Sequence, residues 1–172
     1  MAETAPAASE RLYRAAVGPN ADYYVPLFLG FDATPGTQLS WNWPAFLASF
    51  YWFLYRRMYG LWAIYVVLVP LALALGAAIV TQAGVPRLLG ELACLGFQFV
   101  WVPLIANRLY HRTIRERIAA VRSHAGTEAA QVAALEAQSP VSPRAVAIAI
   151  AAMVALTALA SCLMLQQVQQ IS

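Results

Sequence analysis

The sequence contains no lysine, and only 11% of its 172 residues are charged. A soluble domain usually carries about a quarter of its residues as charged side chains. Because 61% of the residues are hydrophobic, this shortage of charge argues against a large soluble core and favours an integral membrane protein. All 11 basic residues are arginines and the formal net charge is only +3, so the placement of the arginines matters more than their number.

Cysteine and histidine are also scarce, with two of each. Cys94 and Cys162 lie inside apolar runs without a CxxC spacing, which favours two small core residues over a disulfide or a metal site. His111 and His124 lie outside the apolar runs, so a bis-histidine haem within the bilayer is excluded. Because no catalytic triad, phosphate loop or metal-ligand cluster is visible, we predict a non-enzymatic protein with no catalytic residue, metal or cofactor.

Three apolar runs are long enough to cross a hydrocarbon core, which takes roughly 20 helical residues. They cover residues 59–80, 88–106 and 145–165. Residues 81–87 are a short periplasmic loop in this interpretation, so the first two spans form an antiparallel hairpin. The predicted fold class is all-α, an integral membrane protein with three transmembrane helices.

The aromatic stretch before the first span, residues 41–58, is not predicted to cross the membrane. Pro44 to Tyr55 is about 18 Å long as a helix, too short to cross the membrane. Placing Arg56 or Arg57 at mid-bilayer would cost roughly 2.5 to 3.5 kcal/mol each. We therefore predict an N-terminal interfacial helix over residues 41–58, hinged to the first span at the arginines. The predicted lipid-interface residues here are Trp41, Trp43, Trp52, Arg56 and Arg57.

The arginines flank the spans unevenly, which predicts the orientation. Two precede the first span and five follow the second, whereas the hairpin loop holds only Arg87. This pattern predicts a cytoplasmic N-terminus and a periplasmic C-terminus. The predicted layout adds a cytoplasmic segment 1–40 with residues 1–8 disordered, a cytoplasmic helical loop 107–144 and a periplasmic tail 166–172.

The sequence predicts two helices in the loop 107–144. Tyr110, Ile114, Ile118 and Val121 form an apolar stripe, and the arginines lie on the stripe beside it. Thr127 is predicted to cap the second helix. We expect Arg108, Arg112 and Arg115 to contact anionic lipid headgroups or to act only as positive-inside signals, with an acidic partner protein as an alternative. No aromatic interleaving supports nucleic-acid binding.

Glu91 and Gln98 lie seven residues apart on one face of the second span, which predicts that this intramembrane polar face points into the protein. It is either a packing contact or an ion, proton or partner site. We expect Gln98 to meet Thr157, and Glu91 to meet Ser161, in the third span. Asp22 and Asp32 near the N-terminus are interpreted as turn or cap residues.

The sequence from Trp41 to Tyr59, "WNWPAFLASFYWFLYRRMY", resembles a family of small bacterial membrane proteins catalogued as a domain of unknown function. Members carry a signature similar to W-N-W-A-A-F-F-F…W-x-L-Y-R-K-M-Y, after a "YY…F…FD" segment that residues 23–32 resemble. Pro44 and Arg57 depart from the family's usual alanine and lysine. The resemblance covers roughly residues 23–80 and implies a bacterial inner-membrane location, but no activity.

Two functions remain open at this point. The first is a non-enzymatic accessory or scaffold subunit of a larger membrane assembly, with membrane lipids and other membrane subunits or copies of itself as partners. The second is a small oligomeric transport or lipid-handling protein that uses the Glu91/Gln98 face.

Overall fold

The computed structural model describes residues 5–34, 36, 39–84 and 86–171, and these residues form helices and no strand. The helices in chain order are α1 (Ala5–Val17), α2 (Ala21–Ala33), α3 (Trp43–Ala48), α4 (Phe50–Tyr55), α5 (Tyr59–Gln82), α6 (Arg87–Gly96), the π-helical turn η1 (Phe97–Trp101), α7 (Val102–Arg122), α8 (Glu128–Ala137) and α9 (Pro143–Ile171). The predicted all-α class is confirmed for this part of the chain. Three of the helical segments are long and apolar enough to cross a membrane, over Tyr59–Val80, Leu88–Arg122 and Pro143–Gln167.

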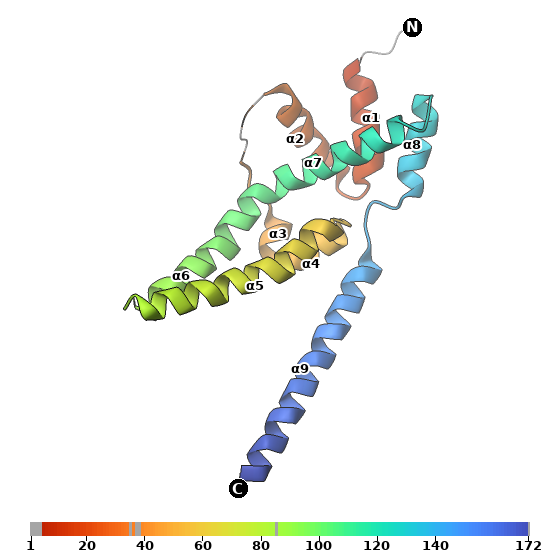
Figure 1. Ribbon diagram of the computed structural model, residues 1–172. Helices are drawn as coiled ribbons and strands as arrows, with labels where there is room; N and C mark the ends of the chain where they lie inside the picture. The colour runs from red at the N-terminus through yellow and green to blue at the C-terminus, as the bar shows by residue number, and fades with distance from the viewer. Residues whose placement is uncertain (1–4, 35, 37–38, 85, 172) are drawn as a thin grey trace.

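A helical head holds most of the buried core. We define it as α1 to α4, α7 and α8, which gather at one end of the molecule in Figure 1. The predicted apolar stripe of α7 is confirmed, since Tyr110 and Ile114 are fully buried and Ile118 and Val121 nearly so. Tyr110 meets the ring of Tyr24 from α2, with ring centroids 5.1 Å apart. Burial of this stripe therefore fixes α7 against the N-terminal helices.

The first helix, α1, begins within the segment that was predicted to be disordered. It runs from Ala5, so residues 5–8 are helical rather than disordered, and residues 1–4 lie outside the described residues. Gly18 ends it with a φ of 61°. A Cβ at this position would lie 2.2 Å from Cγ of Pro140, so the close approach of the α8–α9 connection requires glycine here.

The predicted single interfacial helix over residues 41–58 is wrong in detail. The structure has two short helices, α3 and α4, separated at Ser49, whose φ of 47° and ψ of −127° are not helical. Asn42 caps α3, because its Oδ1 accepts from the backbone nitrogen of Ala45 at 2.7 Å. The Nδ2 of Asn42 donates to Oδ1 of Asn107 at 2.6 Å, and both side chains are fully buried. This pair attaches α3 to α7 instead of leaving it free at a membrane surface.

The hairpin of spans is formed by α5 and α6, which lie side by side (Figure 1). The helix that contains the second predicted span does not stop at residue 106. Through the π-helical turn η1 it continues directly into α7, so the apolar segment and the first helix of the predicted cytoplasmic loop are one helical rod. At 1.5 Å per residue the 35 residues from Leu88 to Arg122 measure about 52 Å. A rod of this length reaches well beyond a hydrocarbon core of about 30 Å.

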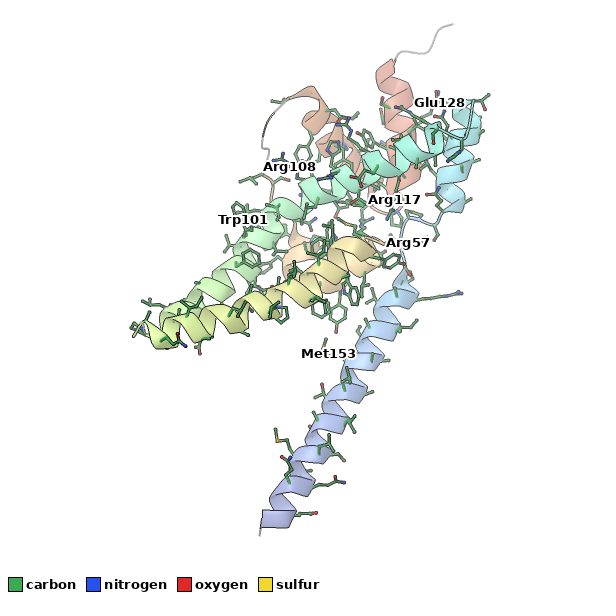
Figure 2. The ribbon with its side chains drawn as sticks, viewed as in Figure 1. Arg57, Trp101, Arg108, Arg117, Glu128 and Met153 are labelled. Carbon is green, nitrogen blue, oxygen red and sulfur yellow. The ribbon has the colours of Figure 1, made fainter. Side chains whose placement is uncertain are left out.

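The last helix, α9, leads away from the hairpin and ends far from the head (Figure 1). Its contacts with the rest of the chain are chiefly with α4 near its own beginning. There the hydroxyl of Tyr51 lies 3.6 Å from the sulfur of Met153, which Figure 2 labels. The helix extends through residues 166–171, which the sequence analysis assigned to a tail.

Candidate functional site

The arginine face of α7 is the largest group of predicted site residues that the structure keeps together. We define it as Arg108, Arg112 and Arg115, which share one side of the helix because they are spaced by four and three residues. All three are exposed. Arg112 pairs with Glu116 at 2.9 Å, and Arg115 lies 3.6 Å from Asp32. Such exposed pairs hold their partners weakly, so the guanidinium groups remain available to other anions.

A groove runs beside this face, with a volume of about 510 Å³. It lies between α7 and the segment that follows α2, and its lining includes Phe31, Arg108, His111, Arg112, Arg115 and Glu116. Three positive charges therefore face one negative charge. Arginine presents a planar fork of donors that fits phosphate and carboxylate oxygens, so this groove can hold an anionic group.

A hydrogen-bonded cluster includes His111, one of the residues that line the groove. The hydroxyl of Tyr13 donates to Oδ2 of Asp32 at 2.5 Å, and it lies 3.2 Å from Nε2 of His111. Nε2 of His111 is also 3.1 Å from Oδ1 of Asp32. Because a carboxylate only accepts, we assign the proton to Nε2, which then donates to Asp32. The cluster joins α1, α2 and α7 and so fixes the position of His111 in the groove lining.

Burial raises the pKa of the Tyr13 hydroxyl above its usual value, and the hydrogen bond to Asp32 raises it further. Tyr13 therefore stays protonated and keeps donating to Asp32 well into the alkaline range. This stable donor holds the Asp32 carboxylate on α2 against α1. The interpretation of Asp32 as a turn or cap residue is therefore wrong, because it lies in α2 and bridges three helices.

Arg56 and Trp52 do not lie where the sequence analysis predicts. Arg56 is 1% exposed, and its Nη1 donates to the carbonyls of Val17 and Pro19 and to the hydroxyl of Tyr110. Trp52 is 3% exposed and packs edge-on against Tyr110. Neither side chain lies on the outer surface of the molecule, because the fold turns this side of α4 into the head.

The other predicted interface residues are more accessible. Trp43 is 62% exposed and Trp41 is half-buried beside it, with ring centroids 5.6 Å apart. Arg57 is half-buried and donates to the carbonyls of Gln138 and Ser139. Contact of Trp41, Trp43 and Arg57 with lipid headgroups stays a prediction.

The two polar residues that were predicted to lie within the membrane, Glu91 and Gln98, have different surroundings in the structure. Gln98 lies in η1, where its side chain accepts from the hydroxyl of Tyr65 on α5 and donates to Oγ of Ser49. The expected pairing with Thr157 is therefore wrong. Thr157 and Ser161 instead donate to backbone carbonyls one turn earlier in α9. Glu91 is exposed on α6, and within the described residues the contacts of α9 are chiefly with α4 rather than with α6.

The residues around the arginine face that sequence reasoning missed are Tyr13, Phe31, Asp32 and His111. They come from α1, α2 and α7, and no local spacing links them. The resemblance had marked Phe31 and Asp32 as part of a signature but gave them no role. Within the described residues, no group of three or more histidine, cysteine or acidic side chains is placed to hold a metal ion.

Comparison with known proteins adds no further assignment, because no family model, curated protein or solved structure matches the chain.

Proposed function

We propose that the protein is a non-enzymatic accessory or scaffold subunit of a larger membrane assembly in a bacterial inner membrane. In this proposal the head lies in the cytoplasm with the N-terminus, and the C-terminus lies on the periplasmic side. The arginine distribution supports this orientation, because Arg108, Arg112 and Arg115 follow the second span and would lie at the inner surface.

The observation that carries the proposal is that the chain buries almost none of its spanning surface by itself. The most apolar windows of the three candidate spans are 0%, 12% and 0% buried, whereas the head has a continuous core. The large apolar side chains of α9 are exposed along its length. A protein that worked alone through its membrane part would pack its spans around a shared polar path. Spans left open in this way are suited to contact other subunits.

The arginine face supplies a second contact in this proposal. Its three guanidinium groups lie on the same helical rod that leaves the membrane, so they can reach the anionic headgroups of the inner leaflet. Each basic residue near such a surface contributes about 1 kcal/mol of binding free energy. Lipid contact here would set the depth and tilt of the rod, and thereby the position of the head.

The alternative function is transport or lipid handling by an oligomer around the Glu91/Gln98 face. The exposed carboxyl side chain of Glu91 on α6 favours it, because a charged group facing hydrocarbon is expensive. The hydrogen bonds of Gln98 count against it. They tie this residue to Tyr65 and Ser49 in the same chain rather than presenting it to a shared pathway.

Site-specific photo-crosslinking from α9 in membranes of the native host tests the proposal. Val154 and Leu156 are 64% and 66% exposed and lie about 200° apart around the helix, so they form a matched pair. A photoreactive residue is placed at each in turn. A specific assembly gives one discrete adduct with another membrane protein from one of the two positions. Adducts only with the same chain would favour the oligomeric alternative, and adducts with lipid alone would contradict both.

A further inference from the structure

Arg56 carries a buried positive charge without a carboxylate partner among the described residues. It is 1% exposed and makes no ion pair, although three backbone or hydroxyl oxygens accept from its Nη1. Its guanidinium also lies over the rings of Tyr24 and Tyr110, at 4.7 and 5.0 Å from their centroids. These neighbours are neutral, so they solvate the charge without cancelling it.

Two buried donors at this place lack an acceptor. Nε of Arg56 and Nε1 of Trp52 are both buried without a hydrogen-bond partner. Buried N–H groups are nearly always paired, because an unmet donor costs roughly 1 to 3 kcal/mol. The combination of an uncompensated cation and unmet donors indicates that an anionic acceptor belongs here.

A groove between α3, α4 and the beginning of α9 reaches Trp52 and Arg56. Its volume is about 320 Å³, at the lower end of the range for ligand sites. Its lining includes Asn20, Leu47, Ala48, Trp52, Arg56 and Val146, from α3, α4, the beginning of α9 and the α1–α2 connection. Most of the lining is apolar, and Asn20 and Arg56 supply polar groups at one end of it.

The polar end has a further group for a ligand. Asn20 precedes α2 with a φ of 69°, and its side chain makes no capping hydrogen bond to that helix. The apolar end opens where α9 begins, beside the exposed side chains of Trp43 and Leu47. A molecule that fits must therefore combine an anionic group with a hydrocarbon chain.

We propose that this groove binds one anionic phospholipid from the inner leaflet. Its phosphate group lies at the Asn20 and Arg56 end, and one acyl chain follows Leu47 and Val146 between α3 and α9. The occupant is assigned by charge complementarity to Arg56 and by the opening of the groove at the start of a candidate span. This site is separate from the arginine face of α7, and it rests on the membrane placement proposed above.

The test uses the full-length protein in nanodiscs that contain equal amounts of phosphatidylglycerol and phosphatidylcholine. After transfer to detergent, native mass spectrometry counts the phospholipids that each chain retains. We expect one retained phosphatidylglycerol. Ala48→Trp fills the groove from its apolar side and leaves Arg56 in place, so it should weaken retention at least about tenfold. Ile64→Trp, at an exposed position of α5, is the matched control and should retain the lipid.

Arg56→Gln should remove the preference for the anionic lipid, and Ala48→Trp keeps the test valid if the Arg56 variant does not fold. Equal retention of both lipids, or unchanged retention in Ala48→Trp, would overturn the proposal. Retention of a free fatty acid in place of the phospholipid would overturn it as well. Resistance of the same proteins to alkaline carbonate extraction tests the membrane placement separately, so failure of the groove and failure of the placement are distinguishable.

Discussion

At the scale of single residues, the hydroxyl of Tyr13 joins α1 to α2 and α7 through Asp32 and His111. Its pKa is raised, so the folded state holds this proton at a pH where the unfolded chain, with an ordinary pKa of about 10, releases it. The stabilisation is therefore fully present below about pH 10 and is lost as the pH rises toward the folded-state pKa.

We predict that the free energy of unfolding falls less steeply with pH in Tyr13→Phe than in the unchanged protein. Between about pH 10 and pH 11 the difference in slope should approach 1.4 kcal/mol per pH unit, the largest that one proton can give. Denaturant unfolding in detergent at a series of pH values measures it. Tyr23→Phe is the control, because Tyr23 is 51% exposed. Parallel curves for the unchanged protein and Tyr13→Phe would contradict the prediction.

At the scale of elements, Ser49 decides that the aromatic stretch forms two helices instead of one. Its backbone has a positive φ, which is strained for any residue with a Cβ, while its Oγ takes part in the hydrogen bonds of Gln98 and Tyr65. The strain and the side-chain bonds therefore act in opposite directions on stability.

Two substitutions at this position separate these effects. Ser49→Ala keeps the strain and loses the hydrogen bonds, whereas Ser49→Gly loses both. We predict that the glycine variant is the more stable of the two by about 1 kcal/mol, the reverse of the order at an ordinary helical position. Thermal unfolding of both variants measures this, with Ala and Gly at the exposed helical position Ala133 as control. An alanine variant more stable than the glycine variant would show that Ser49 does not have a positive φ.

The register of the α5–α6 hairpin is fixed by the contact of Val80 with Gly90. A Cβ built at Gly90 would lie 3.9 Å from Cβ of Val80, which falls within the 3.5 to 4.5 Å of disulfide-bonded cysteines. This contact allows the hairpin to be tested directly by cysteine pairing.

We predict that Val80→Cys combined with Gly90→Cys forms a disulfide on mild oxidation, in a background with Cys94 and Cys162 replaced by serine. Gly90→Cys combined with Val154→Cys is the control, because within the described residues the contacts of α9 are chiefly with α4 rather than with α6. A shift in electrophoretic mobility after oxidation and proteolysis between the spans reads out the bond. Failure of the first pair, with both cysteines reactive to maleimide, would place the hairpin in another register.

At the scale of the whole molecule, the head and the free end of α9 lie at opposite ends (Figure 1). Since the candidate span of α9 follows the head in the chain, the head and the C-terminus lie on opposite sides of the membrane in the proposed orientation. In this orientation α9 crosses the membrane once, after the head. The side of the membrane on which the C-terminus lies therefore depends on whether α9 inserts.

We predict that alkaline phosphatase fused to the C-terminus is active in cells and that green fluorescent protein fused there is dark. Phosphatase needs the periplasm for its disulfides, and the fluorescent protein folds in the cytoplasm. Green fluorescent protein fused to the N-terminus should fluoresce and serves as the control. A fluorescent C-terminal fusion with inactive phosphatase would mean that α9 is not inserted or that the topology is inverted.

The sequence by itself determined what depends on neighbouring residues. The three apolar runs predicted the long helices, because hydropathy adds up along the chain. The period of Tyr110, Ile114, Ile118 and Val121 predicted which side of α7 is buried, and therefore which side carries the exposed arginines. The cap of α8 at Thr127 was also predictable, since its Oγ1 bonds the backbone nitrogen of Ala130 three residues later.

Only the tertiary structure decided which distant residues meet. Arg56 looked like an interfacial charge because its sequence neighbours are aromatic, but it is enclosed by the end of α1 and by Tyr110, up to 54 positions away. Gln98 bonds Tyr65 and Ser49 rather than Thr157, because α9 diverges from the hairpin. Tyr13 and His111 lie 98 positions apart and share one contact. Such pairings arise from how whole helices pack, and no local pattern of polarity or spacing encodes that packing.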